Sequence, residues 1–460
     1  MVVLLKIVQV ILALSLLVLF HEFGHYTFAK LFKTRVEKFY LFFNPKFSLV
    51  KFKRFGGKWH CKFLSPNEDA EWDAHPEQTE YGIGWLPFGG YCKIAGMIDE
   101  SMDTEAMKLP PQPYEFRTKP AWQRFFIMFG GVLFNFILAI ILYAAIFNHW
   151  GEEYLRNENA IYGIAVNDLS SEIGFRDGDR ILAFDGQPID NFSSLQVDLV
   201  RSQAREATVL RDGDTLSIAI DPQYLPAMLN TPGMFDLAFP FVVKEVQPES
   251  PNAGADLQPG DAVTGINGQP MFIVQQIQRE LAQHRGEGIT ADIHRADTDI
   301  EVPLQVDTAG HIGVLLDTDL TKYFEVTTKE YNLLTAIPAG AKKTWTTIKG
   351  YVQELGLIFS PKTQAYKSVG SFIAIGRIFP DTWDWYRFWS LCALLSIMLG
   401  VMNLLPIPAL DGGHILFLIF EMITGRKPSD KFMVVAEWIG MALLLLLMVL
   451  AFGNDIRSLF

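Results

Sequence analysis

Cysteine is scarce in this chain, with only three among 460 residues. They are Cys61, Cys92 and Cys392, and no two of them form a C-x-x-C pair. The long polar region between residues 148 and 387 contains none of them, so it cannot be a disulfide-rich domain. A zinc site built from cysteine pairs is excluded as well.

The first apolar run lacks the features of a cleavable signal peptide. Lys6 is the only basic residue before its apolar core, and no small-x-small cleavage site follows it. The apolar pattern also continues beyond the usual length of a signal-peptide core. We therefore expect a retained membrane helix at this end of the chain.

Hydrophobic residues are abundant, at 50% of the chain, and they are concentrated in four long stretches. Each stretch is close to the ~20 residues that a helix needs to cross the hydrocarbon core. The polar region between the second and third stretches is long enough for two small domains. The expected fold is a polytopic α-helical membrane protein with four transmembrane helices, at residues 1–32, 123–148, 386–414 and 432–453.

The basic residues indicate the orientation of these helices. They flank the helices on one side of the membrane, whereas the region 148–387 is rich in Asp and Glu despite a chain charge of only −12. Basic flanks stay on the cytoplasmic side. The loop 33–122 and the short loop before residue 432 are therefore expected inside, with both termini and the large polar region outside. The basic flanking residues are Lys30, Lys33, Arg35, Lys38, Arg117, Lys119, Arg124, Arg426, Lys427 and Lys431.

The first helix contains the pattern His21-Glu22-Phe23-Gly24-His25, which is H-E-x-x-H. On a helix, residues i and i+4 project from one face, so His21 and His25 can bind one metal ion together. Glu22 is then placed to accept a proton from water, whose pKa a zinc ion lowers to about 7. Ionisable groups inside a membrane helix are costly and are usually functional. The alternative is a pair of polar residues lining a pore or the membrane surface.

Asp411 is the best candidate for a third ligand. It lies near the end of the third apolar stretch, and counting along both helices places it at a depth similar to that of His21. His414 is a possible alternative ligand, although an interfacial or supporting histidine is the simpler interpretation. Most other histidines lie in polar regions.

Pro406 and Pro408 interrupt the third apolar stretch just before Asp411. Two prolines at this spacing cannot continue a helix, and broken backbone at membrane depth is tolerated where it lines a cavity or a site. We expect the segment to present Asp411 and to offer backbone contacts to substrate. A simple helix end near the surface is the alternative.

Together these motifs resemble those of the site-2 protease family of intramembrane zinc proteases. The resemblance extends to Leu86–Lys93, to Ala121–Arg124 with Phe134-Asn135-Phe136, and to Ser368–Ser371. It implies that Zn²⁺ is bound by His21, His25 and Asp411, that Glu22 is the catalytic base, and that Asn403 helps to hold the substrate strand or the reaction intermediate. The family usually has Gly-Pro before the asparagine of the second helix, where this chain has Gly130-Gly131.

The polar region contains an internal repeat. Residues 173–188 recur as residues 255–270, each with an Asp-Gly or Asn-Gly turn between strand-like segments. The copies resemble PDZ domains, which bind extended peptides at a sheet edge. We expect two tandem α+β PDZ-like domains, at residues 152–230 and 238–310. Amphipathic connecting helices are expected at 321–385, lying either on the membrane surface or against the second PDZ-like domain. The loop 33–122 reads as strand-prone, and the resemblance suggests membrane-associated strands.

The expected function is that of an intramembrane zinc endopeptidase. The resemblance implies substrates that are single-span membrane proteins already trimmed by a first protease, such as anti-sigma factors or signal-peptide remnants. It also implies a bacterial inner membrane location, with the PDZ-like domains and both termini periplasmic; the lipid bilayer is the other expected partner, and nucleic acid is not expected. Two alternatives remain, a catalytically inactive PDZ scaffold and an ion or proton pathway protein. No repeat is evident among the four apolar stretches, which disfavours a transporter.

Overall fold

The computed structural model describes residues 2–97, 110–358 and 372–457. The chain divides into two compact units. The first unit combines residues 1–151 with residues 330–356 and 366–460, and it contains all the long apolar helices. The second unit consists mainly of residues 152–329 and contains the repeated polar segments. The expected Ser368–Ser371 motif lies outside the described residues.

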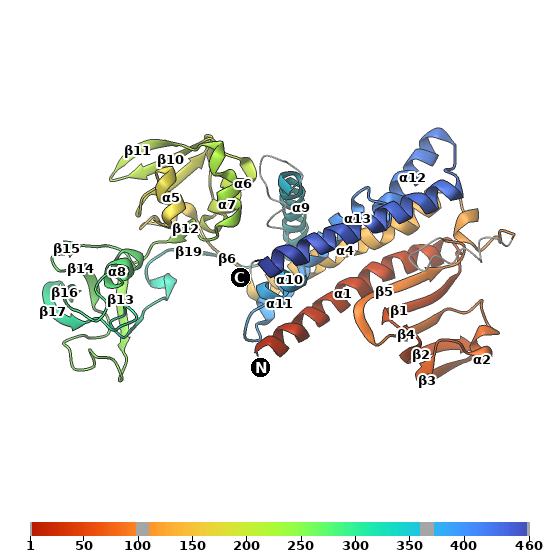
Figure 1. Ribbon diagram of the computed structural model, residues 1–460, viewed down its shortest axis with the longest axis horizontal. Coiled ribbons are helices and arrows are strands. Elements are labelled where there is room, and N and C mark those ends of the chain that lie inside the picture. The colour runs from red at the N-terminus through yellow and green to blue at the C-terminus, as the bar shows by residue number, and fades with distance from the viewer. Residues whose placement is uncertain (1, 98–109, 359–371, 458–460) are drawn as a thin grey trace. The chain divides into compact units, whose positions relative to one another are not determined.

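Within the described residues, four helices of the first unit are long and apolar enough to span a membrane. Helices are the expected form because lipid offers no hydrogen bonds to an open backbone. Of these, α1 and α11 both pack against α4 (Figure 1). These helices are α1 (Val2–Leu31), α4 (Ala121–Trp150), α11 (Trp385–Leu404) and α13 (Asp430–Arg457).

Glycines allow α1 and α4 to touch at the level of the histidines. A Cβ atom on Gly24 would lie 2.1 Å from the carbonyl oxygen of Gly130, and one on Gly130 would lie 2.6 Å from the carbonyl oxygen of Gly24. Small residues at such contacts let helix backbones approach closely in membranes, where packing replaces the hydrophobic driving force. Gly130 thus sits where the backbones of the two helices touch.

The third apolar stretch is not one helix. Helix α11 ends at Leu404, and a short helix, α12 (Asp411–Thr424), begins at Asp411 itself. Pro406 and Pro408 lie in the intervening turn, in which Ala409 has a φ of 77°. The interval 386–414 expected as a single helix therefore contains a helix, a turn and the first residues of another helix, because neither proline can donate a helical hydrogen bond.

The strand-prone loop forms a five-stranded sheet in the order β3-β2-β4-β1-β5. Strands β1 and β4 are parallel, and the other neighbours are antiparallel. The edge strand β5 and its neighbour β1 lie beside α1 (Figure 1). The strands are β1 (Val36–Phe43), β2 (Phe47–Phe55), β3 (Lys58–Pro66), β4 (Glu80–Ile83) and β5 (Leu86–Ile94), with the short helices α2 (Ala70–Asp73) and η1 (Phe116–Thr118) in the same segment.

Helix α9 (Leu333–Ile358) occupies much of the region expected to hold amphipathic connecting helices, followed after a gap by α10 (Phe372–Ile378). Residues 330–356 belong to the unit of the long apolar helices. A Cβ on Gly340 would lie 2.8 Å from the backbone of α4 at Ala144, so the two helices are in close contact. Another face of α9 leaves Leu334 and Trp345 exposed beside Lys342 and Lys349.

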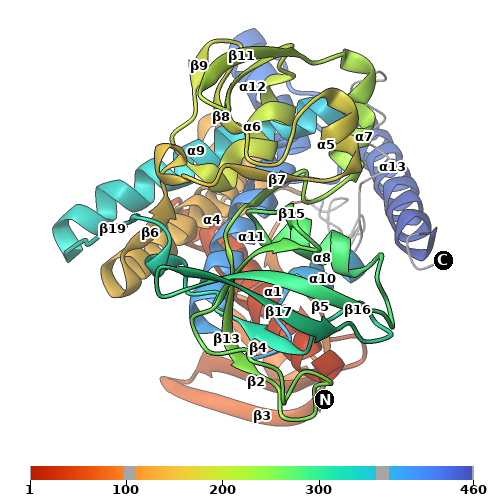
Figure 2. The ribbon, with the colours of Figure 1, turned by 90° about the vertical axis from the view of Figure 1, so that its left-hand side faces the viewer.

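The second unit contains two copies of one α+β arrangement (Figure 2). In each copy a central strand pairs antiparallel with a short following strand and with a longer one after an intervening helix. The first copy contains β7 (Ile164–Val166), α5 (Asp168–Ile173), β8 (Arg180–Phe184), β9 (Gln187–Pro188), α6 (Leu195–Ser202), β10 (Glu206–Arg211), β11 (Asp214–Ala219), α7 (Leu225–Asn230) and β12 (Phe235–Leu237). The second contains β13 (Phe241–Val246), β14 (Ala262–Ile266), β15 (Gln269–Pro270), α8 (Val274–Leu281), β16 (Gly288–Arg295), β17 (Thr298–Gln305) and β18 (Val314–Leu316).

An ion pair of one Asp and one Arg, here called the arginine clasp, occurs at the equivalent place in both copies and shows that the two copies share one arrangement. In the first, Arg211 donates from Nε and one terminal nitrogen to the two carboxylate oxygens of Asp179. In the second, Arg295 makes the same two bonds to Asp261. Each aspartate also accepts from the backbone nitrogen three residues before it. Bidentate hydrogen bonds between arginine and a carboxylate are stronger than single ones, and they fix the orientation of the two side chains.

Each copy has its own hydrophobic core, which supports two tandem PDZ-like domains. Strand β6 (Glu152–Leu155), at the start of the unit, pairs antiparallel with β19 (Val326–Lys329), at its end. Short 3₁₀ segments complete the described elements of this unit: η2 (Asn157–Asn159), η3 (Phe192–Ser194), η4 (Pro222–Tyr224) and η5 (Leu320–Lys322).

Candidate metal centre

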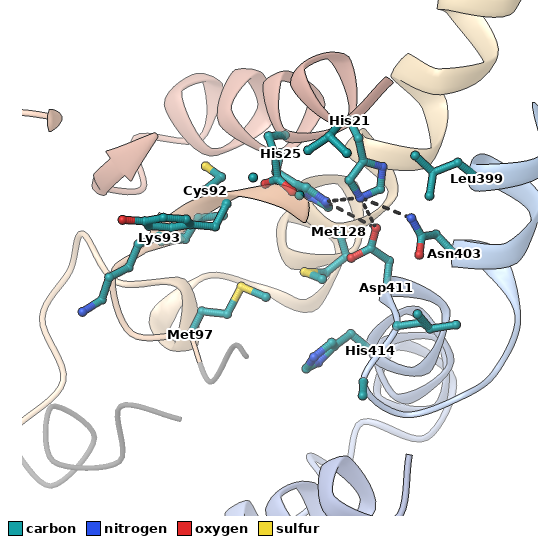
Figure 3. A pocket seen from close by; sticks show the side chains of 18 of the residues that line it. His21, His25, Cys92, Lys93, Met97, Met128, Leu399, Asn403, Asp411 and His414 are labelled. Carbon is teal, nitrogen blue, oxygen red and sulfur yellow. Dashed lines mark hydrogen bonds and ion pairs between the residues drawn. The ribbon is translucent and has the colours of Figure 1, made fainter. Parts of the chain in front are cut away.

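Three predicted ligands converge in the first unit, as Figure 3 shows. The Nε2 atoms of His21 and His25 lie 3.2 Å apart, and Oδ2 of Asp411 lies 3.2 Å from the first and 3.3 Å from the second. All three residues are largely withdrawn from solvent. Within the part of the chain that the structure describes, this is the only such group of potential metal ligands.

The spacing of these atoms fits a zinc ion. Zinc binds nitrogen and oxygen at about 2.0–2.2 Å in a tetrahedron, so its ligand atoms lie about 3.3 Å from one another. Oδ2 of Asp411 is buried and makes no hydrogen bond to the described residues. Two imidazole nitrogens and one carboxylate oxygen are a donor set that zinc accepts, and three protein ligands leave a fourth position for a reactant.

Hydrogen bonds on the far side of each imidazole support this arrangement. Nδ1 of His25 lies 2.8 Å from the carbonyl oxygen of Ile127 on α4, so it must carry the proton and leave Nε2 free to bind a cation. Nδ1 of His21 lies 3.1 Å from the side-chain amide of Asn135, whose Oδ1 has no other partner among the described residues. A 180° turn of that amide would place Oδ1 to accept from His21 Nδ1–H.

Gly131 provides the space that the two imidazoles occupy. A Cβ atom at this position would lie 2.4 Å from Nε2 of His25 and 2.6 Å from Cε1 of His21. The glycine pair that departs from the usual Gly-Pro pattern therefore has a direct role: Gly130 lets the helices touch, and Gly131 leaves room for the side chains of the two predicted histidine ligands.

Glu22 lines the same cavity as the three ligands. Cys92, on the edge strand β5, lines it too. The cavity has a volume of about 700 Å³ and is walled by α1, by β5, by α11 and by the turn before α12. The sheet thus forms one wall beside the predicted catalytic base, which the sequence pattern did not reveal.

The other predicted site residues occupy different positions. Asn403 lines the cavity, and its Nδ2 lies 3.5 Å from Nε2 of His21. Pro406 and Pro408 do not belong to the described lining but form the turn that leads to Asp411. Gly412 and Gly413 follow, where a Cβ would collide with the backbone at Leu405 and Ile407. The turn closes on itself, which explains the two glycines after Asp411.

His414 is a wall residue of the cavity and pairs with Glu437 of α13, their Nε2 and Oε1 atoms being 2.8 Å apart. It is therefore engaged elsewhere and is not one of the three converging ligands. Glu437 was not among the residues expected at the site. Its position could have indicated a role, because an isolated acidic residue inside an apolar stretch is seldom tolerated without a partner.

Comparison with known proteins identifies the family. The model of Peptidase family M50 matches residues 9–65 and 71–447. The chain belongs to this family. It is an intramembrane zinc metalloprotease of the site-2 type, and the predicted resemblance, activity and cofactor are confirmed.

Several bacterial relatives match the chain along nearly its whole length. Protease RseP of Yersinia pestis is 28% identical over 98% of both chains, and the Regulator of sigma-E protease RseP of Salmonella typhimurium has the same identity and coverage. A Ralstonia nicotianae protein named as a candidate zinc metalloprotease is 27% identical over 99% of both chains. A solved PDZ domain of an SdrC-like protein from Listeria monocytogenes covers 17% of this chain and 90% of that domain, with 23% identity and a TM-score of 0.16.

Proposed function

We propose that His21, His25 and Asp411 bind the catalytic zinc ion and that Glu22 is the general base. The observation that carries this assignment is the convergence of three ligand atoms, at zinc-like spacing, beside Glu22 in one cavity. When bound, zinc would polarise the scissile carbonyl group and make water nucleophilic at neutral pH.

The residues around the ligands have complementary roles in this mechanism. Glu22, which lines the same cavity as the ligands, would take the proton from the attacking water and deliver it to the leaving amine. Asn403, whose amide faces the ligand cluster, would donate a hydrogen bond to the substrate backbone near the reacting carbonyl. Ile127 and Asn135 would keep both imidazoles oriented.

The proposed substrates are single-span membrane proteins trimmed by an earlier cleavage. Two relatives are named RseP, one of them as a regulator of sigma-E, which supports an anti-sigma-factor-like substrate. The backbone groups of a transmembrane helix are paired internally, so the helix must open before a carbonyl can react. Substrates should therefore carry residues such as Gly, Pro or Asn near the cut, whereas a poly-Leu span should resist.

The proposed orientation places both termini and the PDZ-like domains in the periplasm of an inner-membrane protein. Basic residues gather around the start of α4 and the loop between α12 and α13, which supports a cytoplasmic location for those ends. Trp150 ends α4, and Trp383, Trp385 and Trp389 surround the start of α11. Tryptophan favours membrane interfaces, so these residues support a second boundary at the opposite ends of the helices.

Metal analysis and cleavage assays test the assignment together. Detergent-purified protein should contain one zinc ion per chain, and Asp411→Asn should lose both the metal and cleavage of a membrane-embedded model substrate. An inactive PDZ scaffold would bind substrate without cutting it, and an ion pathway would conduct without needing zinc. Retention of full zinc content and activity by Asp411→Asn would contradict the proposed ligand set.

A further inference from the structure

The metal ligands come from two helices that are far apart in the chain. His21 and His25 are on α1, whereas Asp411 is the first residue of α12. Helix α12 has 14 residues, a length of about 21 Å. Because a turn separates Asp411 from the end of α11, its position relative to the histidines depends on how the rest of α12 is held.

Helix α4 supports both sets of ligands. It touches α1 at Gly24 and accepts the His25 hydrogen bond at Ile127. It also packs against α12, where Ile415 and Leu418 join a buried cluster that includes Ile127. Apolar contacts such as these are non-directional. A directional polar contact would fix the position of α12 along α4 more closely.

Arg124 and Glu421 supply that contact. Arg124 on α4 donates from a terminal nitrogen to Glu421 on α12, and its Nε donates to the carbonyl oxygen of Lys119 at 2.9 Å. Only 8% of the arginine side chain and 16% of the glutamate side chain are exposed. Replacing a buried ion pair by apolar residues often costs no stability, and the best-attested use of such pairs is to fix register.

We propose that Arg124 and Glu421 are a positioning pair that sets the register of α12 on α4 and thereby places Asp411 against the two histidines. The inference rests on the proposed ligand set. Neither residue touches the reacting atoms; both act through Asp411. Loss of the pair should weaken zinc binding while the helices remain folded.

The decisive variant replaces both partners with apolar residues, Arg124→Met with Glu421→Leu, in the full-length protein. Zinc affinity, measured by chelator competition, should fall about 10-fold or more, the range seen when groups supporting a metal ligand are removed. The visible spectrum of the Co²⁺-substituted protein should change, while the thermal unfolding of the zinc-free protein stays near that of the parent. The exchanged pair, Arg124→Glu with Glu421→Arg, should recover most of the affinity.

Two further variants distinguish the possible failures. Lys6→Met removes the ion pair between Lys6 and Asp381, which is more exposed, and should leave zinc affinity unchanged. Asp411→Asn should abolish tight zinc binding. If Asp411→Asn weakens binding but the apolar double variant binds zinc like the parent, the positioning role is wrong and the ligand set stands. If Asp411→Asn binds zinc normally, the ligand set itself is wrong. The positioning role would also be wrong if the exchanged pair bound zinc no more tightly than the single variants Arg124→Glu and Glu421→Arg.

Discussion

At the scale of single residues, Glu22 lies next to a predicted ligand without being one itself. It is adjacent to His21 but is not among the three residues whose ligand atoms converge. Glu22→Gln keeps the shape and the zinc but cannot accept a proton. We expect cleavage to fall by roughly 10²–10⁴-fold with one zinc ion still bound. Metal analysis and a model-substrate assay on the same preparation check this, and near-normal cleavage would refute the assigned base.

Gly131 gives a second residue-scale prediction. Gly131→Ala adds a methyl group where 2.4 Å separates the new atom from Nε2 of His25, so at least one imidazole must move. Zinc affinity should fall about 10-fold or more. Gly453→Ala on α13 is the matched control, because nothing lies within 4 Å of its added Cβ. Equal zinc affinities for the two variants would show that the imidazoles have room to spare.

At the scale of elements, the sequence predicted what depends on local pattern. Apolar length located the four long helices, H-E-x-x-H placed two histidines on one helix face, and the pair Pro406 and Pro408 signalled a break before Asp411. The second helix, which starts at Asp411, was not predicted. It depends on a closed turn in which Gly412 and Gly413 lie against the backbone, and such contacts are visible only in three dimensions. The partner of His414 was missed for the same reason.

The arginine clasp in the second PDZ-like copy leads to a pH prediction. The hydrogen bonds from Arg295 lower the pKa of Asp261 below its ordinary value. A lowered carboxyl pKa adds stability that is fully present above about pH 4, the ordinary range, and is lost as pH falls through the folded-state value. At pH 7, Arg295→Met should destabilise this copy, because it leaves the Asp261 carboxylate without the arginine that pairs with it.

Hydrogen exchange of the β16 and β17 amides in the full-length protein measures this effect. Exchange should be faster in Arg295→Met than in the parent at pH 7, and the difference should shrink in acid once Asp261 is protonated. Amides of the first copy, which keeps its own clasp between Arg211 and Asp179, serve as the internal control. A difference that is constant across pH would contradict the electrostatic explanation.

At the scale of the whole molecule, the tandem PDZ-like domains are proposed to screen substrates. A protease that cuts within the membrane needs a way to spare intact single-span proteins. Deletion of residues 155–310, with a short flexible joint, should leave zinc binding intact and permit cleavage of substrates that still carry a folded ectodomain. Cleavage assays on matched trimmed and untrimmed substrates, with parent and deleted enzyme, measure the effect. If the domains instead recruit substrate tails, the deletion will slow cutting of trimmed substrates and create no cutting of intact ones.

The pairing of β6 with β19 has a consequence for how such a protein could arise. Because these strands are antiparallel neighbours, the segment of residues 152–329 begins and ends at adjacent points. A bridge of a few residues could therefore replace this segment. Domains could be gained, duplicated or exchanged at this junction by insertion alone, with the metal-binding helices inherited unchanged.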